Sequence, residues 1–110
     1  MIFTQIRSRA ENRNLAFDLD CDFVKKMFVD QDGKCKLSGI EFSFENDTPF
    51  SPSLDRIDSK GGYTKNNVRW VCRIVNYALN KFGDEIFFKM CEAVVKQQKE
   101  KENSNVNAQI

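Results

Sequence analysis

The sequence predicts a single α+β domain in which helices flank a short strand–turn–strand–helix unit. The chain has 110 residues, enough for one hydrophobic core but not for two. Apolar residues recur with helical spacing towards both ends, whereas the middle holds short β-branched and aromatic runs separated by glycines. We therefore expect one domain over residues 1–96, with the strand–turn–strand–helix unit at 53–82 and a polar, disordered tail at 97–110.

Two helices are predicted ahead of this unit. Residues 2–13 carry apolar side chains every four positions, and no glycine or proline interrupts them. A second helix begins at Asp20, whose carboxylate can accept hydrogen bonds from the free amides of the first turn, and it ends before Gly33. Its buried stripe is expected to comprise four apolar side chains: Phe23, Val24, Met27 and Phe28.

The next part of the chain contains the predicted strands. Alternating apolar side chains at Ile40, Phe42 and Phe44 indicate a short hairpin in residues 35–45. Further on, Pro52 disfavours a helix. The two strands of the central unit are then expected at SLDRID (53–58) and VRWV (68–71), joined by a turn with two adjacent glycines.

Two further helices complete the predicted fold. CRIVNYALNKF, residues 72–82, has apolar residues at helical spacing. A last helix is expected to start at Asp84 as its N-cap and to run through DEIFFKMCEAVVKQQ. One face of this helix is expected to be buried in the core through Phe87, Phe88, Cys91, Val94 and Val95.

The composition excludes several classes of protein. No run of about 18 apolar residues is present, so a membrane-spanning protein is not expected. The first residues lack the apolar segment of a secretory signal, so we expect a cytoplasmic protein whose four cysteines are buried free thiols. The chain contains no histidine, which excludes histidine acid–base catalysis, Ser-His-Asp triads and histidine-containing metal sites.

Charge is distributed unevenly along the chain, although the formal net charge is only +1. Residues 14–53 carry four bases and eight acids, a net charge of −4. Residues 55–81 carry six bases and two acids, a net charge of +4, and they coincide with the central unit. This segment is expected to form an anion-facing surface, with a merely solvated face as the alternative. The acidic half favours, more weakly, a protein–protein inhibitor.

Three polar residues of the central unit have the chemistry of a metal site. Asp55 lies on the first strand, Asn67 precedes the second, and Asn76 lies on the following helix. An Asp carboxylate and an Asn carbonyl are oxygen ligands of the kind that a hard divalent cation prefers. The residue types alone leave open that all three are turn and cap residues.

A longer pattern around these residues resembles a known family. The pattern D-R-I-D-x-x-x-G-Y-x-x-x-N-V-R-W-V-C-x-x-x-N, from Asp55 to Asn76, is similar to the core of the HNH family of ββα-metal (His-Me finger) endonucleases. The resemblance is closest to a small subgroup common in phages and mobile elements. It extends upstream to RSRAENRNLAFDLD and GKCKLSG, so that it covers residues from about 7 to 81.

The resemblance implies a ββα-metal finger and a role for each matching residue. Asp55 and Asn76 would bind one divalent ion, Mg²⁺ or Mn²⁺, and Asn67 would tie the loop between the strands together and orient the base. Arg56 stands where most of the family has the histidine that activates water, and arginine is a poor base but a good phosphate clamp. Either another activator such as Asp58 replaces that histidine, or the site is catalytically inactive. A purely structural pairing of Arg56 with Asp58 is a further alternative.

The resemblance also bears on zinc. Cys35 and Cys72 match the first cysteine of each zinc knuckle in many relatives, but the second positions are Ser38 and Val75. No structural zinc is therefore expected. Apolar packing around Phe42, Trp70 and Ile74 is expected to replace it.

The implied function is divalent-metal-dependent DNA endonuclease activity, an enzyme that nicks or cuts phage or mobile-element DNA. The alternative is a catalytically inactive DNA-binding or interaction module of the same fold. Expected partners are DNA and, because so small a domain contacts little DNA alone, a second copy as a homodimer or another protein. Five basic residues are expected to contact phosphate: Lys60, Lys65, Arg69, Arg73 and Lys81.

Overall fold

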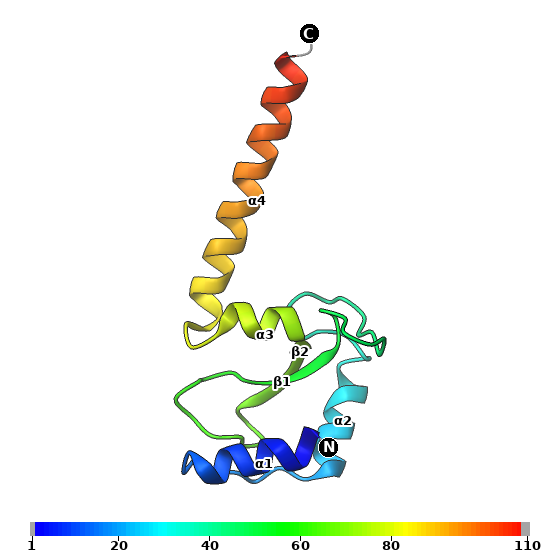
Figure 1. The fold of residues 1–110 in the computed structure, drawn as a ribbon, viewed down its shortest axis with the longest axis vertical. Helices are drawn as coiled ribbons and strands as arrows, with labels where there is room; N and C mark the ends of the chain where they lie inside the picture. The colour runs from blue at the N-terminus through cyan, green and yellow to red at the C-terminus, as the bar shows by residue number, and fades with distance from the viewer. Residues whose placement is uncertain (1, 109–110) are drawn as a thin grey trace.

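The computed structural model describes residues 2–108, which form a mixed α+β fold (Figure 1). The elements in chain order are α1 (Ile2–Asn12), α2 (Cys21–Asp30), β1 (Pro52–Arg56), β2 (Val68–Cys72), α3 (Arg73–Leu79) and α4 (Gly83–Ala108). β1 and β2 pair antiparallel, with Asp55 opposite Arg69, and α3 follows β2 without a loop. This order is compatible with the ββα layout that the sequence predicts.

The two-stranded sheet lies between two hydrophobic clusters, because successive side chains of a strand point to opposite faces. Leu54 and Val68 pack with Ile6 and Ala10 of α1 and with Val24 of α2. Val71, on the other face, belongs to a second cluster that also contains Cys35, Phe42 and Cys72. Figure 1 shows the sheet between α1 and α3.

The helix signals before the sheet are confirmed. The Phe23 backbone N–H donates to Asp20 Oδ1 at 2.7 Å, so Asp20 is the N-cap of α2. In the predicted stripe, Val24 is buried and the other three side chains are half-buried.

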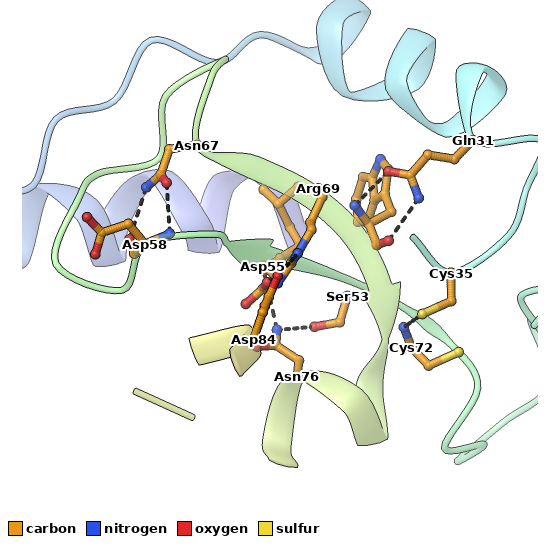
Figure 2. Close-up of polar contacts among 12 residues, drawn as sticks. Gln31, Cys35, Ser53, Asp55, Asp58, Asn67, Arg69, Cys72, Asn76 and Asp84 are labelled. Carbon is orange, nitrogen blue, oxygen red and sulfur yellow. Dashed lines mark hydrogen bonds and ion pairs between the residues drawn. The ribbon is translucent and has the colours of Figure 1, made fainter. Parts of the chain in front are cut away.

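Gln31 attaches the end of α2 to β2. The Trp70 backbone N–H donates to Gln31 Oε1 at 2.9 Å, and Gln31 Nε2 donates back to the Trp70 carbonyl at 2.8 Å (Figure 2). The Trp70 indole N–H donates to the Val24 carbonyl at 2.9 Å. The Gln31 side-chain amide thus satisfies the backbone N–H and C=O of Trp70, which a further strand would otherwise pair with.

The hairpin predicted in residues 35–45 does not form a strand ladder. The segment contains an isolated bridge between Lys34 and Glu41, and the Cys35 N–H donates to the Ile40 carbonyl at 2.8 Å across a tight turn. Phe42 is buried, but Ile40 and Phe44 are 46% and 75% exposed. The alternating pattern predicted a hairpin wrongly because, among the described residues, no further strand extends the sheet next to this segment.

The buried face predicted for the last helix is wrong. Cys91 is exposed, Val94 is 61% exposed, and Phe88 and Val95 are about equally half-exposed. α4 also continues to Ala108, where the sequence predicted a disordered tail, because no glycine or proline interrupts its Glu-, Lys- and Gln-rich stretch. Residues 109–110 of that tail lie outside the described residues. No helix within residues 2–108 has both the length and the apolar composition to cross a membrane.

Gly62 allows the loop between β1 and β2 to lie against the segment before α2. The Tyr63 N–H donates to the Ala16 carbonyl at 2.9 Å, and the Asp18 N–H donates to the Tyr63 carbonyl at 3.2 Å. A Cβ on Gly62 would meet the Ala16 backbone, with its nitrogen at 2.8 Å. Only glycine fits this approach without a backbone shift.

We expect Gly62→Ala to lower the free energy of unfolding by about 3 kcal/mol, because the loop must move away from Ala16. Gly39→Ala is the matched control. A Cβ on Gly39 has no neighbour within 4 Å, so the only loss of stability is that of placing an alanine in left-handed backbone at φ +72°, about 1 kcal/mol. Urea unfolding of both variants tests this. Equal losses would show that the contact with Ala16 is unimportant.

Candidate functional site

The central feature of the strand–strand–helix unit is a carboxylate–arginine triad of Asp55, Arg69 and Asp84. Arg69 Nε donates to Asp55 Oδ2 at 2.9 Å, and its Nη1 donates to Asp84 Oδ2 at 2.7 Å (Figure 2). Asp55 and Arg69 are only 6% and 7% exposed. Asp84, in the first turn of α4, therefore connects this helix to both strands.

The three groups of the triad influence one another's ionisation. Burial raises the pKa of Asp55 above its ordinary value, and the hydrogen bond and charge of Arg69 only partly oppose this. The hydrogen bond from Arg69 lowers the pKa of Asp84. The hydrogen bond to Asp84 raises the pKa of Arg69, which keeps its charge. The three side chains are therefore held together by the Arg69 guanidinium, which stays positively charged.

The residues expected to hold a divalent ion do not fit one in this arrangement. The Asp55 carboxylate is engaged by Arg69, and the cavity beside them has a volume of about 10 Å³, roughly one water molecule. Asn76 donates from Nδ2 to Ser53 Oγ at 2.7 Å and to the Leu54 carbonyl at 3.4 Å. In this arrangement the positive charge beside Asp55 is that of Arg69.

Arg56 binds the loop that follows β1. Its Nη1 donates to the Ser59 carbonyl at 2.8 Å and to the Gly61 carbonyl at 2.9 Å. Its guanidinium carbon lies 5.2 Å from the centre of the Tyr63 ring. The sequence also allowed Arg56 to pair with Asp58, but in the structure the guanidinium binds these two carbonyls instead.

Asn67 closes the same loop from its other end. Its Oδ1 accepts from the Asp58 N–H at 2.9 Å, and its Nδ2 donates to the Asp58 carbonyl at 3.0 Å (Figure 2). The same Nδ2 also donates to the Gly62 carbonyl at 2.9 Å. Asn67 thus ties the loop together, as the resemblance implies. Arg56, which stands where the resemblance would place a histidine base, binds the same loop.

A separate cleft of about 510 Å³ opens between α1, β1 and α3. We call it the arginine cleft, and its polar and aromatic lining includes Gln5, Arg9, Ser53, Tyr63, Arg73, Asn76 and Tyr77. The Arg73 guanidinium lies 3.4 Å from an Asp47 carboxylate that is 91% exposed. Since a contact with so exposed a carboxylate is weak, Arg73 remains available to another anion.

The predicted phosphate contacts are divided among three places. Arg73 lines the arginine cleft, whereas Arg69 is buried in the triad, which corrects its expected role at the surface. The three lysines lie outside the cleft: Lys65 is 3.6 Å from Asp20, and the exposed Lys60 and Lys81 lie on the β1–β2 loop and after α3. Of the predicted site residues, Arg73 and Asn76 thus come together in the arginine cleft, and Asp55 and Arg69 come together in the triad.

Two residues of these sites were missed by sequence reasoning. Arg9 belongs to the predicted helix at 2–13 but has no sequence signal of its own, and its place in the cleft depends on how α1 packs on the sheet. The sequence predicts Asp84 as an N-cap, yet Asp84 lies within the first turn of α4 and its carboxylate binds Arg69 of β2. An acidic residue in a first helical turn is too common to reveal such a partner.

The cysteines are buried only in part, since Cys35 and Cys72 are buried whereas Cys21 and Cys91 are exposed. The Cys72 N–H donates to Cys35 Sγ at 3.3 Å. Burial raises the pKa of the Cys35 thiol, but hydrogen bonds from Ser38 and from backbone N–H groups outweigh it and lower the pKa overall. Burial and the adjacent Cys35 raise the pKa of Cys72 to about 11. Phe42 and Trp70 pack around the pair as expected, but Ile74 is 52% exposed and does not.

Comparisons with protein-family models, with curated proteins and with solved structures find no match for this chain.

We expect Arg69→Met to lower the free energy of unfolding by about 3–5 kcal/mol, because it leaves the Asp55 carboxylate buried without a counter-charge. Adding Asp55→Asn should restore part of that loss, since the remaining buried group is then neutral. Urea unfolding of the two single variants and the double variant measures the coupling. Additive losses would contradict a direct interaction between the two side chains.

The pH dependence of stability should report on Asp84. Its pKa is lowered in the folded state, so ionised Asp84 stabilises the fold fully above the ordinary value of 3.8, and this contribution is lost as pH falls through the folded pKa. Asp84→Asn should therefore be less stable than wild type at pH 7, and the difference should shrink as pH falls below 3.8. A constant difference across this pH range in thermal unfolding would contradict the assignment.

Proposed function

We propose that the protein is a DNA-binding module that holds the DNA backbone in the arginine cleft without hydrolysing it. The observation that carries the proposal is that Arg9 of α1 and Arg73 of α3 line one cleft together with the Ser53 hydroxyl and the Asn76 amide. Guanidinium groups bind phosphate oxygens through paired charge-assisted hydrogen bonds. A hydroxyl and an amide are further groups that commonly contact the backbone of DNA.

A nucleic acid suits this cleft better than a small anion does. Its volume of about 510 Å³ exceeds what one phosphate fills, and the exposed Tyr77 ring offers an apolar surface to a sugar or a base. Residues 55–81 carry a net charge of +4, and the exposed Lys60 and Lys81 add positive charge outside the cleft. The resemblance to HNH proteins favours DNA among nucleic acids.

Binding without hydrolysis is supported by what the candidate catalytic residues contact. Asp55 is engaged by Arg69, and the Arg56 guanidinium is bound to loop carbonyls. Arginine keeps its proton near neutral pH and is a poor base. The chain has no histidine to act as the base at β1.

The second candidate is the divalent-metal-dependent endonuclease activity that the resemblance implies. The observation in its favour is the order β1–β2–α3. In this unit Asn76 of α3 hydrogen-bonds to Ser53 of β1 and lines the arginine cleft. This activity would require Asp55 to be released from Arg69.

We expect Arg9→Ala and Arg73→Ala each to weaken binding of a short duplex about tenfold in ~0.1 M salt. Each should also reduce the slope of log K against log salt by about one, since one phosphate contact is lost. Fluorescence anisotropy over a salt series measures both quantities. Lys26→Ala is the matched control, because Lys26 pairs with Asp30 on the outer side of α2 and should leave the affinity unchanged.

A parallel assay with supercoiled plasmid and Mg²⁺ or Mn²⁺ separates the two candidates. Binding without nicking supports the proposal. Nicking by wild type that is lost in Asp55→Asn and Asn76→Ala but kept in Lys26→Ala would support the endonuclease instead. No salt-sensitive binding of any duplex by wild type would overturn the DNA-binding proposal as a whole.

A further inference from the structure

The long helix α4 extends away from the rest of the protein. Figure 1 shows it pointing out from α3, and the molecule measures 60 × 28 × 23 Å along its principal axes. Its attachment lies at its first turn, where Asp84 binds Arg69 and the preceding Phe82 N–H donates to the Leu79 carbonyl at 2.9 Å. A helix with so little tertiary packing is only marginally stable in water unless another surface covers it.

One side of this helix is apolar and uncovered. We call it the α4 face, comprising Ile86, Phe87, Met90, Cys91, Val94 and Val95. These side chains, continued by Phe82 and by Ala78 of α3, line an open groove of about 580 Å³. On the opposite side of the helix, charged residues recur at positions i, i+4, i+7 and i+11: Glu85, Lys89, Glu92 and Lys96.

We propose that the α4 face is a dimerisation surface that packs against the same face of a second copy of this chain, with the two helices antiparallel. The proposal goes beyond DNA binding and does not depend on it.

The exposed area is close to what a stable dimer needs. Ile86, Met90, Val94 and Val95 are each at least 51% exposed, as is the adjoining Phe82. With about 100 Å² exposed for each of these side chains, the apolar area is roughly 500 Å². A stable interface covers about 800 Å² on each partner, of which about 65% is apolar at its core. This area lies within the range of about 300–600 Å² for the largest apolar patch of a monomer, and such patches are often functional.

The order of side chains along the α4 face is complementary to itself in an antiparallel pair. With the two-fold axis between Met90 and Cys91, Phe87 of one copy lies opposite Val94 of the other, and Ile86 lies opposite Val95. Larger side chains thereby meet smaller ones, which favours close packing. This arrangement pairs residues 83–98 of the two helices, and because each folded body is attached at the start of its own α4, the two bodies lie at the two ends of that paired segment.

The oligomeric state of the full chain without DNA tests the proposal. Sedimentation equilibrium at about 10–100 μM should give twice the 12.8 kDa mass of the chain. Met90→Glu should raise the dimer dissociation constant at least about 100-fold, because dimerisation would bury a carboxylate without a partner. Lys89→Glu, which puts the same side chain on the charged side of the helix, should leave the dimer intact.

The results that overturn the proposal are equally definite. A monomeric wild type over this range, as expected if a different protein or a following segment of a longer chain covers the α4 face, excludes the dimer. Equal weakening by Met90→Glu and Lys89→Glu excludes this face as the interface. Circular dichroism of both variants checks that α4 remains helical, and since Met90 lies outside the core, neither variant should unfold the domain.

Cysteine cross-linking tests the antiparallel arrangement. In a background of Cys21→Ser and Cys91→Ser, chains carrying Ile86→Cys are mixed with chains carrying Val95→Cys and oxidised. The mixed disulfide should form at least about tenfold faster than either self-disulfide. Preferential Ile86→Cys self-cross-linking indicates parallel helices and overturns the proposed geometry.

Discussion

The rest of the structure depends on the buried guanidinium of Arg69. It lies on β2, binds a carboxylate of β1 through Asp55 and a carboxylate of α4 through Asp84, and is itself almost fully buried. Removing an arginine from water is costly unless its donors are satisfied by charged partners. The three side chains therefore stabilise the fold only as a set. They also join the start of α4 to the sheet, so the direction in which the long helix leaves the domain follows from the same contact.

The chemistry of the central unit follows from this contact as well. Asp55 is the residue that the resemblance to HNH endonucleases assigns to a metal ion, yet here a protein cation neutralises it. Arg56, at the position of the missing histidine, holds the β1–β2 loop with Asn67 on the other side of that loop. Arg9 and Arg73 of the arginine cleft remain available to an anion. Binding of a phosphate backbone is accordingly the chemistry that the available side chains support.

The two proposed surfaces complement each other physically. A single domain of 110 residues contacts few phosphates, so its affinity for DNA and its selectivity are both limited. Two copies joined through the α4 face would present two arginine clefts, and the second contact would then be intramolecular. The charged side of α4, with Lys89 and Lys96, would remain exposed in such a dimer.

The sequence by itself determined the local elements: α1, α2, both strands and α3 lie where periodicity, the Asp20 cap and the β-branched runs predict them. These signals are local because they depend on residues within one or two turns. Only the tertiary structure decided what the polar residues do. Arg69 meets partners 14 and 15 positions away, and Arg9 reaches the cleft because α1 packs on the sheet. The same limit explains α4: an amphipathic pattern predicts that a face will be covered, but the pattern does not say whether the same chain covers it.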